Sequence, residues 1–343
     1  RPKMPMNKVP LPLGKLDMSF LADLLSRYAH VAPRVVVGAQ VGEDAAVIDF
    51  GDRYLVAKTD PITFATDQIG WYVVHINAND LATTGATPRW LLVTLLLPER
   101  RTTRGLVESI FQQLHNACDD IGVALIGGHT EITAGLDRPI VVGQLLGEVE
   151  KDRLVKTDSV RVGDEIVLAK GIAIEATAII ARERAQDLRS RGYSPEWIAR
   201  AQEYLYDPGI SVLREARLAT ATVLVHAMHD PTEGGLATGL HELARAARVG
   251  VQVERERILV LPECAELCRA YGLDPLGVIA SGALLLAVAP EDSPALFSAY
   301  RQAGIPAAII GQIVPESEGL KMRSGSDLVD LPRFDQDEIT RIF

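Results

Sequence analysis

An acidic turn that leads straight into a helix is the most informative feature of the chain. Asp230 and Thr232 offer oxygen ligands, and Gly234 and Gly235 let a bulky group approach the backbone. The helix predicted from Leu236 to Ala247 would point its positive N-terminus at a bound anion. The turn therefore suits phosphate chemistry. Asp-Pro-Thr-Glu is also an ordinary beginning of a helix, so the stretch alone leaves both interpretations open.

Two further acidic patterns lie beside predicted strands closer to the N-terminus. Glu43 and Asp44 precede a strand of small and β-branched residues, and Lys58 and Asp60 stand where the next strand is predicted to end. Carboxylates in such places suit Mg²⁺, which prefers hard oxygen ligands, and Lys58 could face a phosphate. A solvated turn and a common Asp-Pro strand exit explain the same residues equally well.

Polar side chains interrupt an otherwise apolar helix that is predicted over Ile69 to Thr84. Asn79 and Asp80 form the interruption, and His75, Asn79 and Thr83 share one face because residues four apart in a helix lie above one another. A ligand site would explain these residues, and so would a buried network in which every hydrogen bond is satisfied.

A pair of glycines follows a short apolar strand predicted over Val123 to Ile126. Gly127, Gly128, His129 and Thr130 would then stand at the carboxyl end of a strand, where α/β folds gather ligands. A single histidine such as His129 is more often structural than a ligand. The sequence has neither a Walker-type Gly-Lys-Ser/Thr motif nor a paired-glycine dinucleotide fingerprint, so a nucleotide would be held by another device.

Composition and charge exclude several classes of protein. The 35 basic and 45 acidic residues give a net charge of −10, and no basic block could follow a nucleic-acid backbone. The longest apolar runs are shorter than the roughly 20 residues of a membrane helix, and the N-terminus lacks the apolar core of a secretory signal. Three cysteines are too few for a disulfide scaffold, which favours the cytoplasm. We therefore expect no nucleic-acid partner and no membrane span.

Short strands alternate with amphipathic helices along the chain, which predicts an α/β or α+β architecture. The length of 343 residues favours two domains. We expect an N-terminal extension over 1–13, a first domain over 14–154, a second over 155–318 and a tail over 319–343. The other predicted elements are a hairpin across Gly51-Asp52, strands at 90–97, 140–149, 165–168, 251–255, 283–289 and 307–314, and helices at 16–28, 103–121, 174–189, 197–206, 212–218 and 293–303.

Taken in order, five motifs resemble the aminoimidazole ribonucleotide (AIR) synthase-related, or PurM-like, superfamily. The last of them is also most similar to the HypE group of hydrogenase maturation factors, and the first is similar to the thiamine-monophosphate kinase group as well. The motifs are Gly42-Glu43-Asp44-Ala45-Ala46-Val47, Thr59-Asp60, the run from Asn79 to Pro88, Gly127-Gly128-His129-Thr130 and the run from His229 to Leu236, and Gly272-Leu273-Asp274-Pro275-Leu276 supports the HypE likeness.

The resemblance implies a two-domain PurM-like fold, with an N-terminal domain that forms a β-barrel across a homodimer and a C-terminal α/β sandwich. It also implies ATP and Mg²⁺ in the cleft between the domains, and phosphorylation that activates a small-molecule or protein-borne acceptor. The implied metal carboxylates are Asp44, Asp60, Asp80 and Asp230. The implied nucleotide contacts are Lys58, Asn79, Gly127, Gly128 and Thr130, with Thr232, Gly234 and Gly235 from the second domain. No catalytic base is assigned.

The sequence departs from the HypE pattern at two places. His129 stands where HypE-like and thiamine-phosphate kinase-like members usually have Asp; His there is similar to selenophosphate synthetase, whose reactive N-terminal Cys or selenocysteine this sequence lacks. HypE uses the Cys of a Pro-Arg-Ile-Cys tail, whereas this sequence reads Leu331-Pro332-Arg333-Phe334 and ends in Ile342-Phe343. We therefore expect an acceptor separate from this chain. A non-catalytic nucleotide-binding partner or maturation scaffold and a thiamine-monophosphate kinase are the alternatives.

Overall fold

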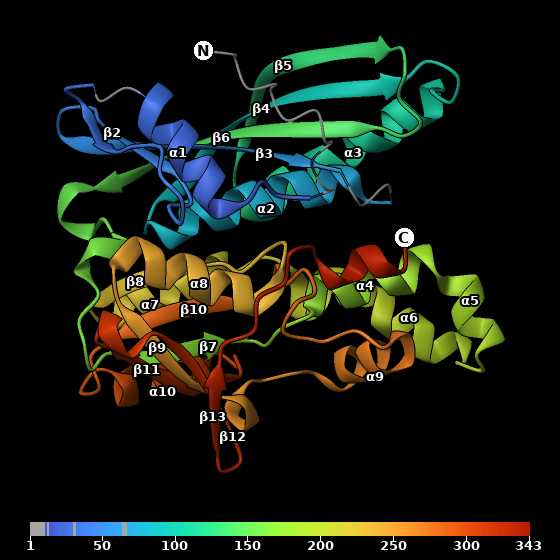
Figure 1. Cartoon of the computed structure of the whole chain (residues 1–343). Coiled ribbons are helices and arrows are strands. Elements are labelled where there is room, and N and C mark those ends of the chain that lie inside the picture. Colours follow the sequence, from blue (N-terminus) through green and yellow to red (C-terminus); the bar gives the residue numbers. More distant parts are fainter. Residues whose placement is uncertain (1–10, 12–13, 30–31, 64–66) are drawn as a thin grey trace, which may run out of the picture.

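Two α/β halves lie one above the other in the computed structural model (Figure 1). The structure describes residue 11 and residues 14–29, 32–63 and 67–343, so that the predicted N-terminal extension over 1–13 falls outside the described residues apart from Leu11. A single short connection after residue 150 joins the halves (Figure 1).

The first half is built on a six-stranded sheet with the strand order β1-β2-β3-β6-β4-β5. All neighbouring strands are antiparallel except β4 and β5, which are parallel. The strands are β1 (Val35–Val37), β2 (Ala46–Asp49), β3 (Arg53–Ile62), β4 (Thr87–Pro98), β5 (Ala124–Thr133) and β6 (Ile140–Glu150), and the helices are α1 (Met18–Tyr28), α2 (Ile69–Thr83) and α3 (Arg104–Ile121).

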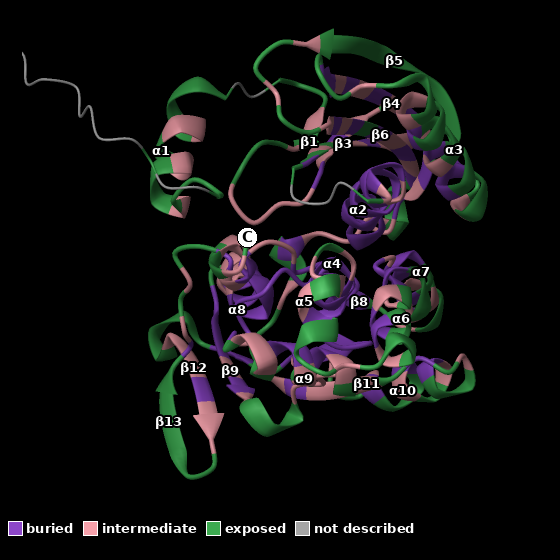
Figure 2. Ribbon diagram, turned by 90° about the vertical axis from the view of Figure 1, so that its right-hand side faces the viewer, coloured by how far each residue is buried: buried purple, intermediate pink, exposed green. Residues whose placement is uncertain are grey.

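Helix α2 lies between the first sheet and the second half of the molecule (Figures 1 and 2). It packs on β3 and β6 on one side and on helix α7 and strand β8 on the other. All of its residues except Trp71 are buried. A helix with apolar residues on most of its circumference needs cover on every side, and this position between the two layers provides it.

The second half is built on a seven-stranded sheet with the order β13-β12-β9-β11-β7-β10-β8. Its strands are β7 (Glu165–Ala169), β8 (Val225–His229), β9 (Gly250–Glu254), β10 (Leu284–Val288), β11 (Ala307–Val314), β12 (Leu320–Ser324) and β13 (Asp327–Asp330). Its helices are α4 (Ile174–Glu183), α5 (Ala185–Ser190), α6 (Pro195–Glu203), α7 (Leu213–Thr222), α8 (Gly235–Ala247), α9 (Pro262–Tyr271) and α10 (Ser293–Gln302).

Helices cover both faces of the second sheet. Ile166 and Leu168 of β7 share a core with α8, whereas Val167 and Ala169 share another core with α7 and α10. Since successive side chains of a strand point to opposite faces, α8 and α7 must lie on opposite faces. The central strands can therefore be apolar throughout, and β7 and β10 are almost entirely buried.

The structure confirms most predicted elements and changes several of them. The hairpin across Gly51-Asp52 forms between β2 and β3. Strands β1 and β8 are not in the prediction, and the helix predicted over 174–189 breaks at Arg184 into α4 and α5. The segment treated as a tail over 319–343 supplies β12 and β13 to the second sheet, with β12 parallel to β9. Among the described residues, no helix is long and apolar enough to cross a membrane.

Candidate metal and phosphate site

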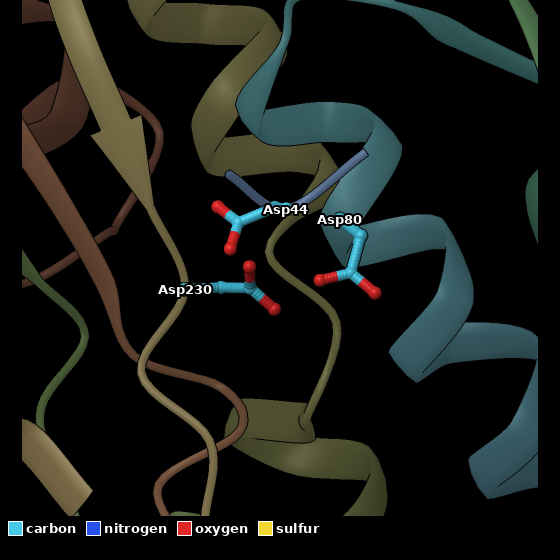
Figure 3. Close-up of side chains that lie close together, drawn as sticks. All are labelled: Asp44, Asp80 and Asp230. Atoms are coloured by element: carbon cyan, nitrogen blue, oxygen red, sulfur yellow. The ribbon is translucent and has the colours of Figure 1, made fainter. Parts of the chain in front are cut away.

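Three aspartates from distant parts of the sequence meet where the two halves face each other. Asp44 precedes β2, Asp80 lies on α2, and Asp230 directly follows β8. One carboxylate oxygen from each lies within 4.8 Å of the others, a spacing at which one metal ion could bind all three. Figure 3 shows the three carboxylates turned toward one another. The structure thus brings together three of the four metal carboxylates expected from the sequence.

The carboxylates of Asp80 and Asp230 are only 3% and 2% exposed. Among the described residues, both carboxylate oxygens of Asp230 have no hydrogen-bond partner, and Oδ2 of Asp80 has none either, although it lies in an ion pair with Lys58. Burial raises the pKa of both carboxyls well above its usual range, and the neighbouring carboxylates raise it further. Buried oxygens without partners are costly unless something else satisfies them, and a divalent cation would do so.

Lys58 places one positive charge beside these carboxylates. Its Nζ lies 3.3 Å from Oδ2 of Asp80 and 3.5 Å from Oδ2 of Asp60. Burial alone would lower the pKa of Lys58, but the surrounding aspartates outweigh it and raise the pKa. Both Lys58 and Asp60 lie inside β3 rather than at a strand exit, because β3 continues to Ile62. Asp60 therefore reaches Lys58 and is not one of the three clustered carboxylates.

A histidine bridge that the sequence analysis missed joins the two halves beside the aspartates. His229, the last residue of β8, contacts Oδ2 of Asp44 through Nδ1 at 2.9 Å and Oε2 of Glu242 through Nε2 at 3.1 Å. Burial would lower the pKa of His229, yet the two carboxylates raise it well above its ordinary value. His229 lies in the fifth motif and Glu242 in the helix predicted after it, but no local pattern in the sequence indicates that the two side chains meet.

The turn after Asp230 is held by the protein itself. The amide of Gly234 donates to Oδ2 of Asp337 at 2.7 Å, and Gly234 and Gly235 have φ values of +83° and +69°. A Cβ at Gly235 would lie 2.5 Å from the carbonyl oxygen of Leu276. These glycines are thus required by the turn and by the close approach of the neighbouring loop. Thr232 Oγ1 lies 3.3 Å from Nζ of Lys15, another residue that the sequence analysis did not select.

Asn79 lies on α2 with no exposed surface and ties the two halves together. Its side-chain amide donates to the carbonyl oxygen of Ile210, and its oxygen accepts from the amide of Val212, both at 2.8 Å. This arrangement matches the satisfied buried network that was left open for this helix. Among the described residues, both ring nitrogens of His75 on the same face lack a hydrogen-bond partner.

The glycines of the fourth motif lie within β5 and not at its carboxyl end. Strand β5 continues to Thr133 because Gly128, with φ of +148°, lets its backbone lie against Val93 of β4. A Cβ at Gly128 would lie 1.9 Å from the Val93 carbonyl oxygen. Gly127, Thr130 and His129 are exposed along this edge strand, and His129 Nε2 contacts Glu131 at 3.1 Å. Two strands, β6 and β4, separate β5 from Lys58 on β3.

The oxygen donors of Asp44, Asp80 and Asp230 fit a hard cation such as Mg²⁺. Lys58 beside them fits the charge of a phosphate. With neither cysteine nor neutral histidine in the cluster, a soft metal is a poorer fit than Mg²⁺.

Residues 42–149 match the N-terminal domain model of AIR synthase related proteins, and residues 161–322 match the C-terminal domain model. The chain therefore belongs to the AIR synthase related family, as its motifs predicted. Within that family it is HypE-like. It is 29% identical over 330 residues to a hydrogenase expression/formation protein of Methanocaldococcus jannaschii, with 93% of this chain and 94% of the relative covered. It is 30% identical over 300 residues to carbamoyl dehydratase HypE of Azotobacter vinelandii, with 84% of each covered.

Two solved structures share the two-domain α/β fold. One is the hydrogenase maturation protein HypE in complex with ATP, with a TM-score of 0.70 and 22% identity over 95% of this chain and 97% of that one. The other is AaThiL complexed with AMPPCP and TMP, with a TM-score of 0.71 and 19% identity over 93% of this chain and 98% of that one. At these identities the likeness establishes the fold, which confirms the predicted two-domain architecture within one chain.

Proposed function

We propose that the protein is an ATP- and Mg²⁺-dependent enzyme that activates an acceptor by phosphorylation, as a HypE-like member of its family. The cluster of Asp44, Asp80 and Asp230 supports the proposal most directly, because buried carboxylate oxygens without partners fit a divalent cation. The relatives named carbamoyl dehydratase HypE and the fold shared with an ATP complex of HypE support the nucleotide.

In this proposal the chain's own residues act mainly by position and charge. Asp44, Asp80 and Asp230 would hold Mg²⁺, which neutralises the phosphate oxygens when bound. Lys58, fixed between Asp60 and Asp80, would supply the second positive charge at the phosphates. The expected nucleotide contacts from β5 and from the turn at Thr232 remain proposals.

We propose an acceptor that is a separate small molecule or a group carried by a protein partner in hydrogenase maturation. The three cysteines of the sequence support a separate acceptor, because Cys118, Cys264 and Cys268 are buried and burial raises the pKa of each thiol, to about 11, 12 and 12. A solved HypE structure is a HypE-HypF complex, which motivates the search for a protein partner. Unpaired cysteines also support a cytoplasmic setting.

Titration calorimetry with ATP in the presence and absence of Mg²⁺ tests the proposal. We expect Mg²⁺-dependent binding. Asp80→Asn should weaken this binding at least tenfold, because it removes the negative charge of one metal ligand without changing the shape of the side chain. Asp327→Asn, on the exposed β12–β13 hairpin, is the matched control and should bind as the wild type does. Unchanged affinity in Asp80→Asn would contradict the assignment, and absent Mg²⁺-dependent binding in the wild type would overturn the function.

Turnover separates the proposed function from its alternatives. Phosphate release that depends on an added acceptor supports an enzyme. Tight ATP binding without release, together with a stable complex in pull-downs, would instead indicate a nucleotide-binding scaffold. Incubation with thiamine phosphate, ATP and Mg²⁺ tests the kinase alternative, since thiamine diphosphate is its expected product.

We also propose a homodimer that pairs the first sheets of two subunits. Strand β5 is an edge strand whose Leu125, Ile126 and Ile132 are 39%, 55% and 62% exposed. A long apolar edge strand offers unpaired backbone groups to a second chain, which is the usual reason that such an edge is covered.

A further inference from the structure

A cavity of about 270 Å³ lies between the first sheet and helix α7, away from the clustered aspartates. Four arginines from separate elements line it: Arg53 of β3, Arg89 of β4, Arg153 after β6 and Arg217 of α7. Arg217 belongs to the second half of the molecule and the other three to the first half and its connection. In Figure 2, α7 lies directly below α2, at this junction.

The positive charges in this cavity exceed the negative ones. Arg53 pairs with Glu148 at 3.3 Å and with Glu150 at 3.5 Å, and Arg89 reaches the same Glu148 at 3.6 Å. Four guanidinium groups thus face two lining carboxylates, which leaves a formal excess of two positive charges within the lining; Asp52, whose exposed carboxylate lies 3.8 Å from Arg53, is outside it.

Arg153 and Arg217 carry this excess. Within the part of the chain that the structure describes, neither guanidinium has a carboxylate partner. Both side chains are exposed to solvent, and desolvation together with the nearby charge of Arg89 lowers the pKa of Arg217. Guanidinium groups that converge without a counter-charge repel one another, and an anion between them would turn the repulsion into attraction.

The size and the donors of the cavity point to an oxyanion. Arginine forks match the oxygens of phosphate and carboxylate groups, and a dianion would balance the excess of two charges. About 270 Å³ is below the roughly 300–1,000 Å³ of ordinary small-molecule sites, so the cavity suits one anionic group rather than a whole cofactor.

We propose that this cavity is a second anion site that binds one phosphate-type dianion between the two halves of the molecule. It is distinct from the proposed Mg²⁺-ATP site. Arg53 lies five residues before Lys58 on β3, which separates the two sites by roughly 17 Å along the strand. An anion held by Arg217 on one side and by Arg89 and Arg153 on the other would link α7 to the first sheet.

Calorimetric titration of the full chain with inorganic phosphate, in EDTA and without nucleotide, tests the proposal. We expect saturable binding of one phosphate and a rise in melting temperature with phosphate concentration. Arg217→Gln should weaken phosphate binding at least tenfold and Arg217→Lys less, while Mg²⁺-ATP affinity should stay unchanged in both. Arg301→Gln, an exposed arginine on α10, is the matched control.

The outcomes distinguish this site from the proposed function. Saturable phosphate binding that Arg217→Gln abolishes and Asp80→Asn leaves intact would support the second site even if ATP binding failed. Equal binding by the wild type, Arg217→Gln and Arg301→Gln would overturn it, as would the absence of saturable binding. Phosphate binding that survives in Arg217→Gln but is lost in Lys58→Met would place the anion beside the aspartates and would also overturn the proposal.

Discussion

At the scale of single residues, the surroundings set the pKa of a buried ionisable side chain, and Glu175 shows this outside the aspartate cluster. Glu175, in the first turn of α4, is 2% exposed, and its Oε2 accepts from the amide of Ser281 at 3.3 Å. Burial raises the pKa of this carboxyl from 4.5 to about 7. The folded chain therefore favours the protonated form below about pH 7, in a range where an ordinary Glu is ionised.

Glu175→Gln tests the consequence for stability. A carboxyl whose pKa is raised on folding stabilises the fold fully below its unfolded pKa of 4.5, and this contribution is lost as pH rises through about 7. The neutral Gln keeps the acceptor and does not ionise, so from pH 4.5 to pH 8 the variant should gain up to about 3 kcal/mol relative to the wild type. Urea unfolding at both pH values measures the difference in the free energy of unfolding between the variant and the wild type, with the exposed Glu291→Gln as control. A difference that does not change with pH would contradict the assignment.

At the scale of elements, the segment after β13 fixes the beginning of α8. Besides the Gly234 amide, Asp337 accepts through Oδ1 from Ile279 at 3.1 Å and from Ile339 at 2.9 Å. The side chain is 2% exposed. One carboxylate thus holds the turn that follows Asp230, the loop before β10 and its own helical turn in one arrangement, and it stands where the helix dipole favours a negative charge.

Asp337→Asn should loosen this turn while leaving most of the fold intact. The amide group replaces one oxygen with a donor, so either the Gly234 bond or the bonds to Ile279 and Ile339 are lost, at a cost of about 1.5–3 kcal/mol of stability. Because Asp230 lies four residues before Gly234, we also expect at least tenfold weaker Mg²⁺-ATP binding. Melting and calorimetry check the two effects, with exposed Asp335→Asn as control. A loss of stability with unchanged nucleotide affinity would limit Asp337 to a structural role.

At the scale of the whole molecule, the exposed edge at β5 is the feature that a single chain leaves uncovered. Ile126→Glu places a charge in the middle of the proposed sheet-to-sheet contact, where desolvating it would be costly. We expect the wild type to sediment as a dimer and the variant as a folded monomer in analytical ultracentrifugation. Leu328→Glu, on the β12–β13 hairpin and 48% exposed, is the control. A monomeric wild type would contradict the dimer.

The sequence by itself determined the alternating elements, the two domains of the family and the carboxylates Asp44, Asp80 and Asp230. The elements and the polar break at Asp80 follow from short-range patterns that are visible within a few turns. The family's domains and the metal role of the carboxylates, with Asp60 among them, were implied by the resemblance of the ordered motifs. The sequence also predicted a strand that stopped before Gly127, since a glycine pair normally reads as a break.

Only the tertiary structure decided which of these residues meet. The His229 bridge to Asp44 and the contact of Asp337 with Gly234 join residues 185 and 103 positions apart, and Arg53 and Arg217, which line one cavity, are 164 positions apart. No local preference encodes such contacts, because they arise when packing of α2 against the second sheet brings separate segments together. The same packing supplies the burial that shifts the pKa values of Asp80 and Asp230.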